Sequence, residues 1–253
     1  MLKPFDGRRH EVSRLEGFSD AVFAFAVTLL VVSLEVPRTF GELSMAMREF
    51  PAFAICFALL FQVWWRHFNF FRRYGLEDRV TIILTGVLLF VVLFYVYPLK
   101  FVFKLVLSQM MGMPLDVRLA DGTTEPMIIG SQTPHLMQIY SGGVVAVFVL
   151  FALMYLHAYR KREELGLTAS EALDTRLDIV DNAGIAAIGV MSLAIATFGG
   201  ALAAAVVAGP IYFLIGPFKF ALGAYSHRAH DRLAALTASP VTPDVTPDVT
   251  PEP

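Results

Sequence analysis

The sequence predicts an all-α membrane protein with six transmembrane helices, because its apolar residues are both abundant and gathered into long blocks. The 253 residues are 56% hydrophobic and 17% charged, whereas a soluble domain is nearer half apolar and a quarter charged. Each block approaches the ~20 residues that a helix needs to cross about 30 Å of hydrocarbon. The blocks are also too long and too uniformly apolar for barrel strands. They cover roughly residues 17–36, 51–71, 80–103, 138–158, 178–198 and 201–221.

The chain before the first block is polar and charged, which is unlike a cleaved signal peptide. The first block is also too long for the apolar region of such a peptide, and no clean small-residue cleavage site follows it. We therefore expect the first span to remain in the mature protein. The single cysteine, Cys56, cannot form an internal disulfide, and its apolar surroundings predict a small core or lipid-facing residue.

The last two spans are expected to form a helical hairpin. Gly199 and Gly200 predict a very tight turn between them, and Pro210 and Pro217 predict bends within the sixth span. The earlier segment 104–137 predicts a long loop on the outer face.

The end of the chain differs in composition from the rest. Residues 237–253 repeat a Val-Thr-Pro-Asp unit, which is typical of an extended, disordered tail with no core to bury. We therefore expect one six-helix membrane domain over residues 1–236, followed by a cytoplasmic tail.

The basic residues predict that both termini face the cytoplasm. If the N-terminus is inside, the cytoplasmic segments hold the larger share of the 20 Lys and Arg residues, by about three to one over the external segments. The net charge of −2 gives no case for nucleic-acid binding.

The first predicted span begins with polar and charged residues, which are unfavourable in a helix that crosses a membrane. A charge deep in a bilayer costs ~2.5–3.5 kcal/mol, so Asp20 is expected to have a partner or to lie in water. Arg14 is six residues earlier and is not an ideal neighbour on the same helix face. Asp20 therefore pairs with another helix or caps backbone donors. The alternative is that Ser19 and Asp20 only mark an interfacial helix start.

One stripe of the first span, at spacings of three and four residues, is a candidate pore lining. Several copies of this helix around an axis would stack apolar rings and one hydroxyl ring, which can gate by dewetting and replace an ion's water. The alternative is that Thr28 only bonds its own backbone at the Ala24 carbonyl. The stripe consists of Phe18, Val22 or Ala21, Phe25, Thr28 or Leu29, and Val32.

Two other polar groups favour structural interpretations. Asp178, Asp181 and Asn182 open the fifth block and are interpreted as caps of that helix rather than a cation site. Thr168 or Ser170, ahead of Glu171, is expected to cap a short helix in the connector before it.

Catalytic and metal-binding patterns are absent from the sequence. His67, His135 and His157 are not at metal-ligand spacing with Cys or carboxylates, and His157 is interpreted as an interfacial anchor. No P-loop, zinc-protease or nucleophile-elbow motif is present. We therefore expect neither an enzyme nor a bound metal or cofactor.

The motif at the start of the first span reads Arg14-x-x-x-Phe18-Ser19-Asp20 and runs directly into "AVFAFAVTLL". It resembles the signature of the transmembrane-protein-175 family of potassium channels. Two further stretches are similar to the family. The second span ends in a Trp-x-x-His pattern at Trp64 and His67, and the third ends in "FYVYPLKF".

The resemblance implies a potassium-permeable channel that conducts passively in the plasma membrane of a prokaryote. Four copies of the chain would assemble with the first helix around a central pore, without a TVGYG-type filter. Phe25, Thr28, Leu29 and Val32 would line and gate this pore, although family members usually have isoleucine or leucine in place of Phe25.

The resemblance also assigns a supporting role to the polar motif. Arg14, Phe18, Ser19 and Asp20 would form a network that locks the first helix to the end of the second, near Trp64 and His67. The indole N–H and the imidazole can supply the donors that Asp20 and Ser19 need.

Two functions of other classes remain open. One is a secondary transporter or proton pathway that uses His and Asp side chains. The other is a non-conducting membrane scaffold in which Phe25 seals the axis.

Overall fold

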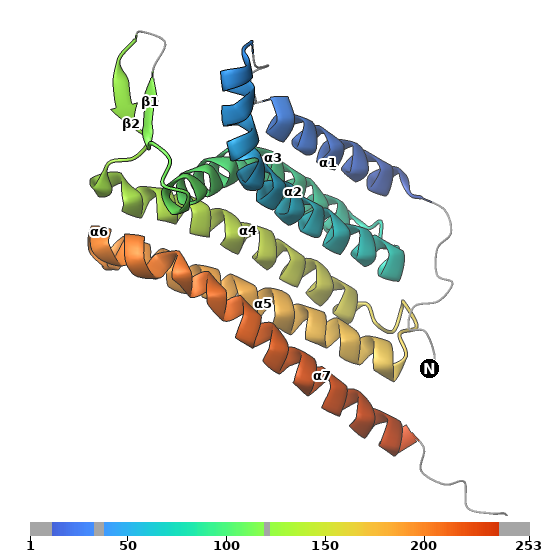
Figure 1. The fold of residues 1–253 in the computed structure, drawn as a ribbon. Coiled ribbons are helices and arrows are strands. Elements are labelled where there is room, and N and C mark those ends of the chain that lie inside the picture. Colours follow the sequence, from blue (N-terminus) through green and yellow to red (C-terminus); the bar gives the residue numbers. More distant parts are fainter. Residues whose placement is uncertain (1–11, 33–37, 119–121, 238–253) are drawn as a thin grey trace, which may run out of the picture.

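The computed structural model describes residues 12–32, 38–118 and 122–237, in which long helices lie side by side in one bundle (Figure 1). The helix α1 (Arg14–Val32) forms one edge of the bundle, and α7 (Ile215–Thr237) forms the opposite edge. Of the tail predicted at 237–253, Thr237 is the last residue of α7, and residues 238–253 lie outside the described residues.

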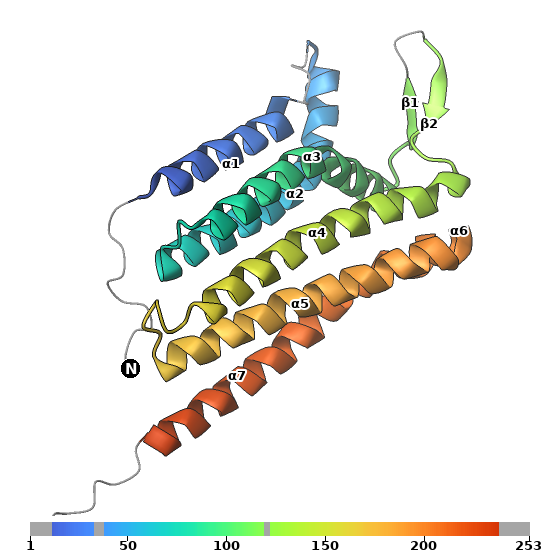
Figure 2. The same cartoon turned by 180° about the vertical axis from the view of Figure 1, so that it is seen from behind.

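The helices α2 (Phe40–Tyr74) and α3 (Arg79–Met110) are both longer than predicted. Each begins at a side chain that accepts a hydrogen bond from the first turn, Thr39 for α2 and Asp78 for α3. Each also contains an internal proline, Pro51 and Pro98, and each visibly changes direction along its length (Figure 2). The extra turns come from amphipathic residues that lie outside the uniformly apolar blocks.

The helices α4 (Thr133–Arg160) and α5 (Ala169–Phe198) form the closest helix pair of the bundle. Thr168 and Glu171 make the expected capping box, with Thr168 N donating to Glu171 Oε2 at 2.8 Å. This box starts α5 itself rather than a separate short helix. The prediction that Asp178 and Asp181 cap the fifth helix is therefore wrong, because they lie more than two turns inside it.

The final span is one interrupted helical run from 200 to 237. Gly199 ends α5, and Gly200, with a φ of 74°, starts α6 (Gly200–Ala203), which confirms the predicted tight turn. A π-helical segment (Ala204–Ala208) and a 3-10 segment (Pro210–Leu214) follow before α7. The irregularity falls at Pro210, as expected. Pro217 lies in the first turn of α7, where a proline is tolerated.

The connection between α3 and α4 contains the strands β1 (Asp116–Arg118) and β2 (Thr124–Pro126). They pair antiparallel and project from one end of the bundle (Figure 1). The purely α-helical prediction missed this hairpin. Its three-residue strands are too short to produce a recognisable alternation.

Five of the helical segments are long and apolar enough to cross a membrane. They are Phe40–Tyr74, Arg79–Met110, Gly130–Arg160, Ala169–Phe198 and Gly200–Leu236. These correspond to five of the six predicted spans, so the chain is a multi-pass membrane protein. The first predicted span, α1, is not among these five, and it carries the charged residues Arg14, Glu16 and Asp20 near its start.

The core lies where α1, α2, α3 and α4 meet. Phe70, Phe151 and Cys56 are fully buried there, so of the two predicted places for the cysteine, core or lipid-facing, it occupies the core. Gly143 of α4 allows the Tyr95 ring of α3 to approach its backbone, and the Tyr95 hydroxyl donates to the Tyr140 carbonyl. A Cβ at Gly143 would lie 2.0 Å from Cε2 of Tyr95.

Gly143→Ala is expected to lower the free energy of unfolding by about 1–3 kcal/mol, because the added methyl overlaps the Tyr95 ring. The neighbouring Gly142→Ala is a matched control, since nothing lies within 4 Å of its added Cβ. Denaturant unfolding of the purified proteins in detergent measures both. Equal stability of the two variants would contradict the close approach of Tyr95.

Candidate functional site

The helix α1 has one buried face and one exposed face. Phe23, Ala26 and Leu30 are buried against the bundle, whereas Phe18 and Phe25 are 61% and 55% exposed. Among the described residues, α1 contacts only α2 and α3. One side of an apolar helix therefore remains available at the edge of the bundle.

The exposed face includes most of the predicted stripe. Ala21 and Thr28 are exposed together with Phe18 and Phe25, whereas Leu29 is half-buried. The α1 stripe is hereafter Phe18, Ala21, Phe25 and Thr28. The side chain of Val32 lies outside the described residues.

The Thr28 hydroxyl donates to the Ala24 carbonyl at 2.9 Å. This is the backbone bond that the sequence analysis gave as an alternative to a pore role. The bond uses the hydroxyl proton and leaves an oxygen lone pair on the exposed face, because a hydroxyl both donates and accepts.

The Asp20 carboxylate is bound across the helix interface. Trp64 Nε1 of α2 donates to Asp20 Oδ1 at 2.7 Å, so the expected bond between the two helices is present. The indole both satisfies the carboxylate and packs in a row of aromatic rings along α2, with Phe61 at 5.2 Å and Phe68 at 5.5 Å between centroids. Arg14 lies on the exposed side of the first turn of α1.

Two members of the expected network are not joined to it. Ser19 is fully buried, but its hydroxyl donates to the Leu15 carbonyl at 2.8 Å rather than to α2. His67 is 1% exposed, and within the described chain its Nε2 has no hydrogen-bond partner. Its ring instead packs against Phe23 and Phe71, at centroid distances of 5.7 and 4.7 Å.

Glu16 was missed by the sequence analysis although its signal is present. Ser13 and Glu16 have the spacing of a capping box, and Glu16 N donates to Ser13 Oγ at 3.1 Å. The Glu16 side chain is 6% exposed and also accepts from Ser13 N at 3.4 Å. The box fixes the start of α1 at Arg14, six residues before Asp20.

A second polar group joins α2, α5 and α7. Asp181 Oδ2 accepts from Arg66 Nη1 at 3.0 Å, and Asp181 Oδ1 accepts from Lys219 Nζ at 2.7 Å. We call Arg66, Asp181 and Lys219 the Asp181 cluster. Asn182 adds a bond from Arg66 at 3.1 Å, and the cluster carries one more positive than negative charge.

The residue one turn before Asp181 forms a pair of its own. Arg73 Nη1 contacts Asp178 Oδ2 at 2.6 Å, between α2 and α5. The two pairs between α2 and α5, Arg66 with Asp181 and Arg73 with Asp178, could not be read from the sequence, because the partners lie more than 100 positions apart.

A third polar group lies where α3 begins and α4 ends. Asp78 accepts from Thr81 N at 2.9 Å, from the His157 ring, and from Lys161 Nζ at 3.1 Å. Burial raises the pKa of this carboxyl, but these hydrogen bonds outweigh it and hold its pKa well below the usual range. His157 thus anchors one helix end to another.

No group of three or more His, Cys, Asp or Glu side chains suited to a metal ion occurs among the residues that the structure describes. The polar residues are instead distributed in the small interhelical groups described above.

Comparison with known proteins adds two sequence matches. Residues 14–95 match the family model described as endosomal/lysosomal potassium channel TMEM175. A potassium channel of Marivirga tractuosa is 38% identical over 231 residues, which cover 90% of this chain and 93% of that protein.

Two solved structures are also similar. A crystal structure of a variant of the potassium channel MtTMEM175, bound to a nanobody–MBP fusion, superposes with a TM-score of 0.73 at 36% identity. That match covers 87% of this chain and 96% of the solved one. A TMEM175 homolog from Chamaesiphon minutus has a TM-score of 0.52 at 23% identity, over 85% and 99% of the two chains, and supports the fold alone.

Proposed function

This chain belongs to the TMEM175 family, and we propose that it forms a potassium-permeable channel with the α1 stripe facing a central pore. The supporting observation is that α1 leaves Phe25 and Thr28 exposed at the edge of the bundle. An apolar face exposed on a helix that contacts two others needs further partners or lipid. Four copies around one axis would turn that face into stacked rings.

The proposed pore is narrowest at its apolar rings. Four Phe25 side chains would form a constriction that excludes water, and apolar constrictions gate channels by dewetting. Four Thr28 hydroxyls, one helical turn further along, would offer oxygen lone pairs to a partly dehydrated ion. Conduction is passive and needs no cofactor. Leu29 and Val32 complete the proposed lining.

The proposed topology places both termini in the cytoplasm of a prokaryote, with the channel in the plasma membrane. Residues 1–236 form the membrane domain, and 237–253 form the cytoplasmic tail. In this orientation the bond between Asp20 and Trp64 lies toward the cytoplasmic side of the pore, where it holds α1 on α2.

Phe25→Ala is expected to raise potassium flux about tenfold, which corresponds to a barrier lower by about 1.4 kcal/mol. The smaller side chain widens the constriction and lets water enter it. Flux from proteoliposomes under a potassium gradient, and then under a sodium gradient, measures the change and the ion preference.

Phe90→Ala is the matched control, because Phe90 is 71% exposed on α3, away from the α1 stripe. The native mass of the purified protein gives the number of copies in each sample. If both the wild type and Phe25→Ala form tetramers but conduct neither ion, the channel proposal is contradicted. The transporter and the non-conducting scaffold would then remain as alternatives.

A further inference from the structure

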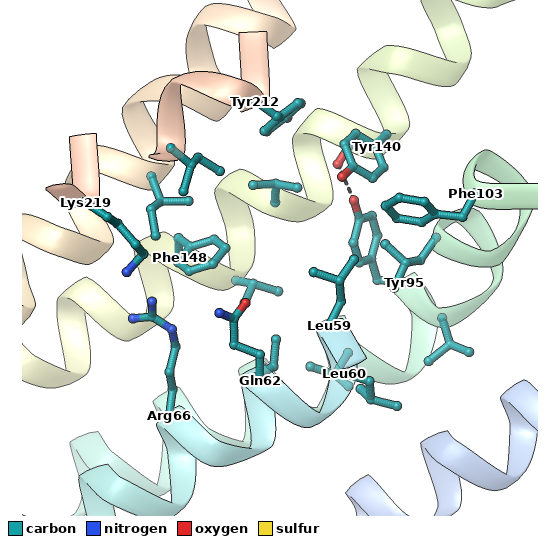
Figure 3. A pocket seen from close by; sticks show the side chains of 18 residues that line it. Leu59, Leu60, Gln62, Arg66, Tyr95, Phe103, Tyr140, Phe148, Tyr212 and Lys219 are labelled. Carbon is teal, nitrogen blue, oxygen red and sulfur yellow. Dashed lines mark hydrogen bonds between the residues drawn. The ribbon is translucent and has the colours of Figure 1, made fainter. Parts of the chain in front are cut away.

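A cavity of about 280 Å³ lies inside the bundle, between α2, α3 and α4 on one side and α5 and the last span on the other (Figure 3). It is lined mostly by apolar side chains, among them Leu59, Val63 and Val147, and the Gln62 amide also reaches into it from α2 (Figure 3). It is separate from the α1 stripe, because no α1 residue lines it.

The two ends of the cavity differ in chemistry. Arg66 and Lys219 lie at one end, whereas Tyr95, Tyr140 and Tyr212 close the other (Figure 3). The Tyr140 and Tyr212 rings meet edge to face, with centroids 5.3 Å apart. The cavity is thus a mostly apolar tube with one amide, Gln62, a cationic end and an aromatic end, which matches an amphiphile with an anionic head.

The charge at the cationic end is not balanced within its own cluster. Arg66 and Lys219 share the single carboxylate of Asp181, so the cluster carries a net charge of one positive unit. Such a charge is costly in a low-dielectric bundle and attracts an anion. The Lys219 side chain is 40% exposed, so a headgroup outside the bundle can reach it.

The size of the cavity limits what enters it. At about 280 Å³, it is slightly smaller than the roughly 300–1,000 Å³ of pockets that enclose drug-sized ligands. A space of this size takes part of one acyl chain, and the rest of the phospholipid stays in the bilayer. In the proposed orientation the cationic end faces the cytoplasmic leaflet, where basic pockets between helices bind anionic headgroups.

We propose that this cavity binds part of one acyl chain of an anionic phospholipid, with its phosphate on Lys219 and Arg66. The lipid neutralises the excess charge of the Asp181 cluster and fills the space between the two halves of the bundle. It therefore acts as a structural ligand that joins α2 to α7 at a distance from the pore.

The test compares the thermal stability of the full-length protein in detergent with added phosphatidylglycerol or phosphatidylcholine. Phosphatidylglycerol is expected to raise the unfolding midpoint by about 2–4 °C, and phosphatidylcholine to have little effect. Native mass spectrometry of the same samples counts the bound lipids. This measurement is made in detergent and does not depend on flux or orientation, so its failure is distinct from that of the channel.

Two variants alter the site, one at its cationic end and one in its apolar lining. Lys219→Gln removes the headgroup contact and leaves Arg66 on Asp181, and Val63→Phe fills the tube without touching the ion pairs. Both are expected to lose at least half of the midpoint shift and the bound lipid. Their matched controls are Lys104→Gln, which alters an ion pair with Glu49, and Val87→Phe, at a residue 43% exposed on α3.

Three results would overturn the proposal. One is an equal response to the two phospholipids. The second is a full phosphatidylglycerol response in Val63→Phe. The third concerns the free fatty acid decanoate. If decanoate raises the unfolding midpoint of the wild type but not of Val63→Phe, and phosphatidylglycerol does not raise that of the wild type, the occupant is a fatty acid.

Discussion

Asp181→Ala is expected to lower the free energy of unfolding by about 3 kcal/mol, at the lower end of the 3–5 kcal/mol found when one partner of a buried ion pair is removed. The side chains of Asp181 and Arg66 are 12% and 15% exposed. Without the carboxylate, Arg66 and Lys219 remain in the bundle as two neighbouring positive charges. The lower end applies because Lys219 can extend its charged group toward water.

Denaturant unfolding in detergent measures this effect, and Glu49→Ala is the comparison. Glu49 pairs with Lys104 at 2.7 Å, but the side chains are 31% and 36% exposed. Such a pair contributes about 0–1 kcal/mol. A loss in Asp181→Ala no larger than that in Glu49→Ala would show that the cluster is not important for stability.

Asp20→Ala is expected to lower the free energy of unfolding by about 1.5–3 kcal/mol, because a hydrogen bond to a charged group is lost and the Trp64 indole is left without its acceptor. The loss falls on the attachment of α1 to α2. The yield of assembled protein should therefore drop, while the ratio of potassium to sodium flux in the remaining channels stays as in the wild type.

Trp64→Phe removes the same bond from the other side and keeps an aromatic ring in the row along α2. Trp65→Phe is its matched control, because Trp65 is adjacent but 50% exposed. Combining Asp20→Ala with Trp64→Phe gives a double-mutant cycle for the pair. Additive effects, or normal yield and stability of Asp20→Ala, would contradict the role given to this bond.

The sequence predicted the spans well because a membrane imposes a simple length and composition on each of them. Five of the six predicted blocks coincide with helices long and apolar enough to span. The boundaries were less accurate, since the amphipathic ends of α2 and α5 continue the helix into polar sequence. Asp178 and Asp181 were misplaced for this reason.

The candidate site was predictable where a local motif carried it. The charge at the span entrance predicted that Asp20 has a partner or a capping role, and the family resemblance placed that partner near Trp64, where the bond is found. Ser19 behaved differently, because a hydroxyl inside a helix can always reach its own backbone. The Asp181 cluster depends on how three distant helices meet, which no local pattern encodes.

Two of the interhelical contacts of α2 come from residues two positions apart, on opposite sides of the helix. Trp64 binds Asp20 of α1, and Arg66 binds Asp181 of α5. Two residues correspond to about 200° of helical rotation. A rotation of α2 about its own axis therefore changes both contacts together. In this way α2 couples the edge helix α1 to α5 and the rest of the bundle.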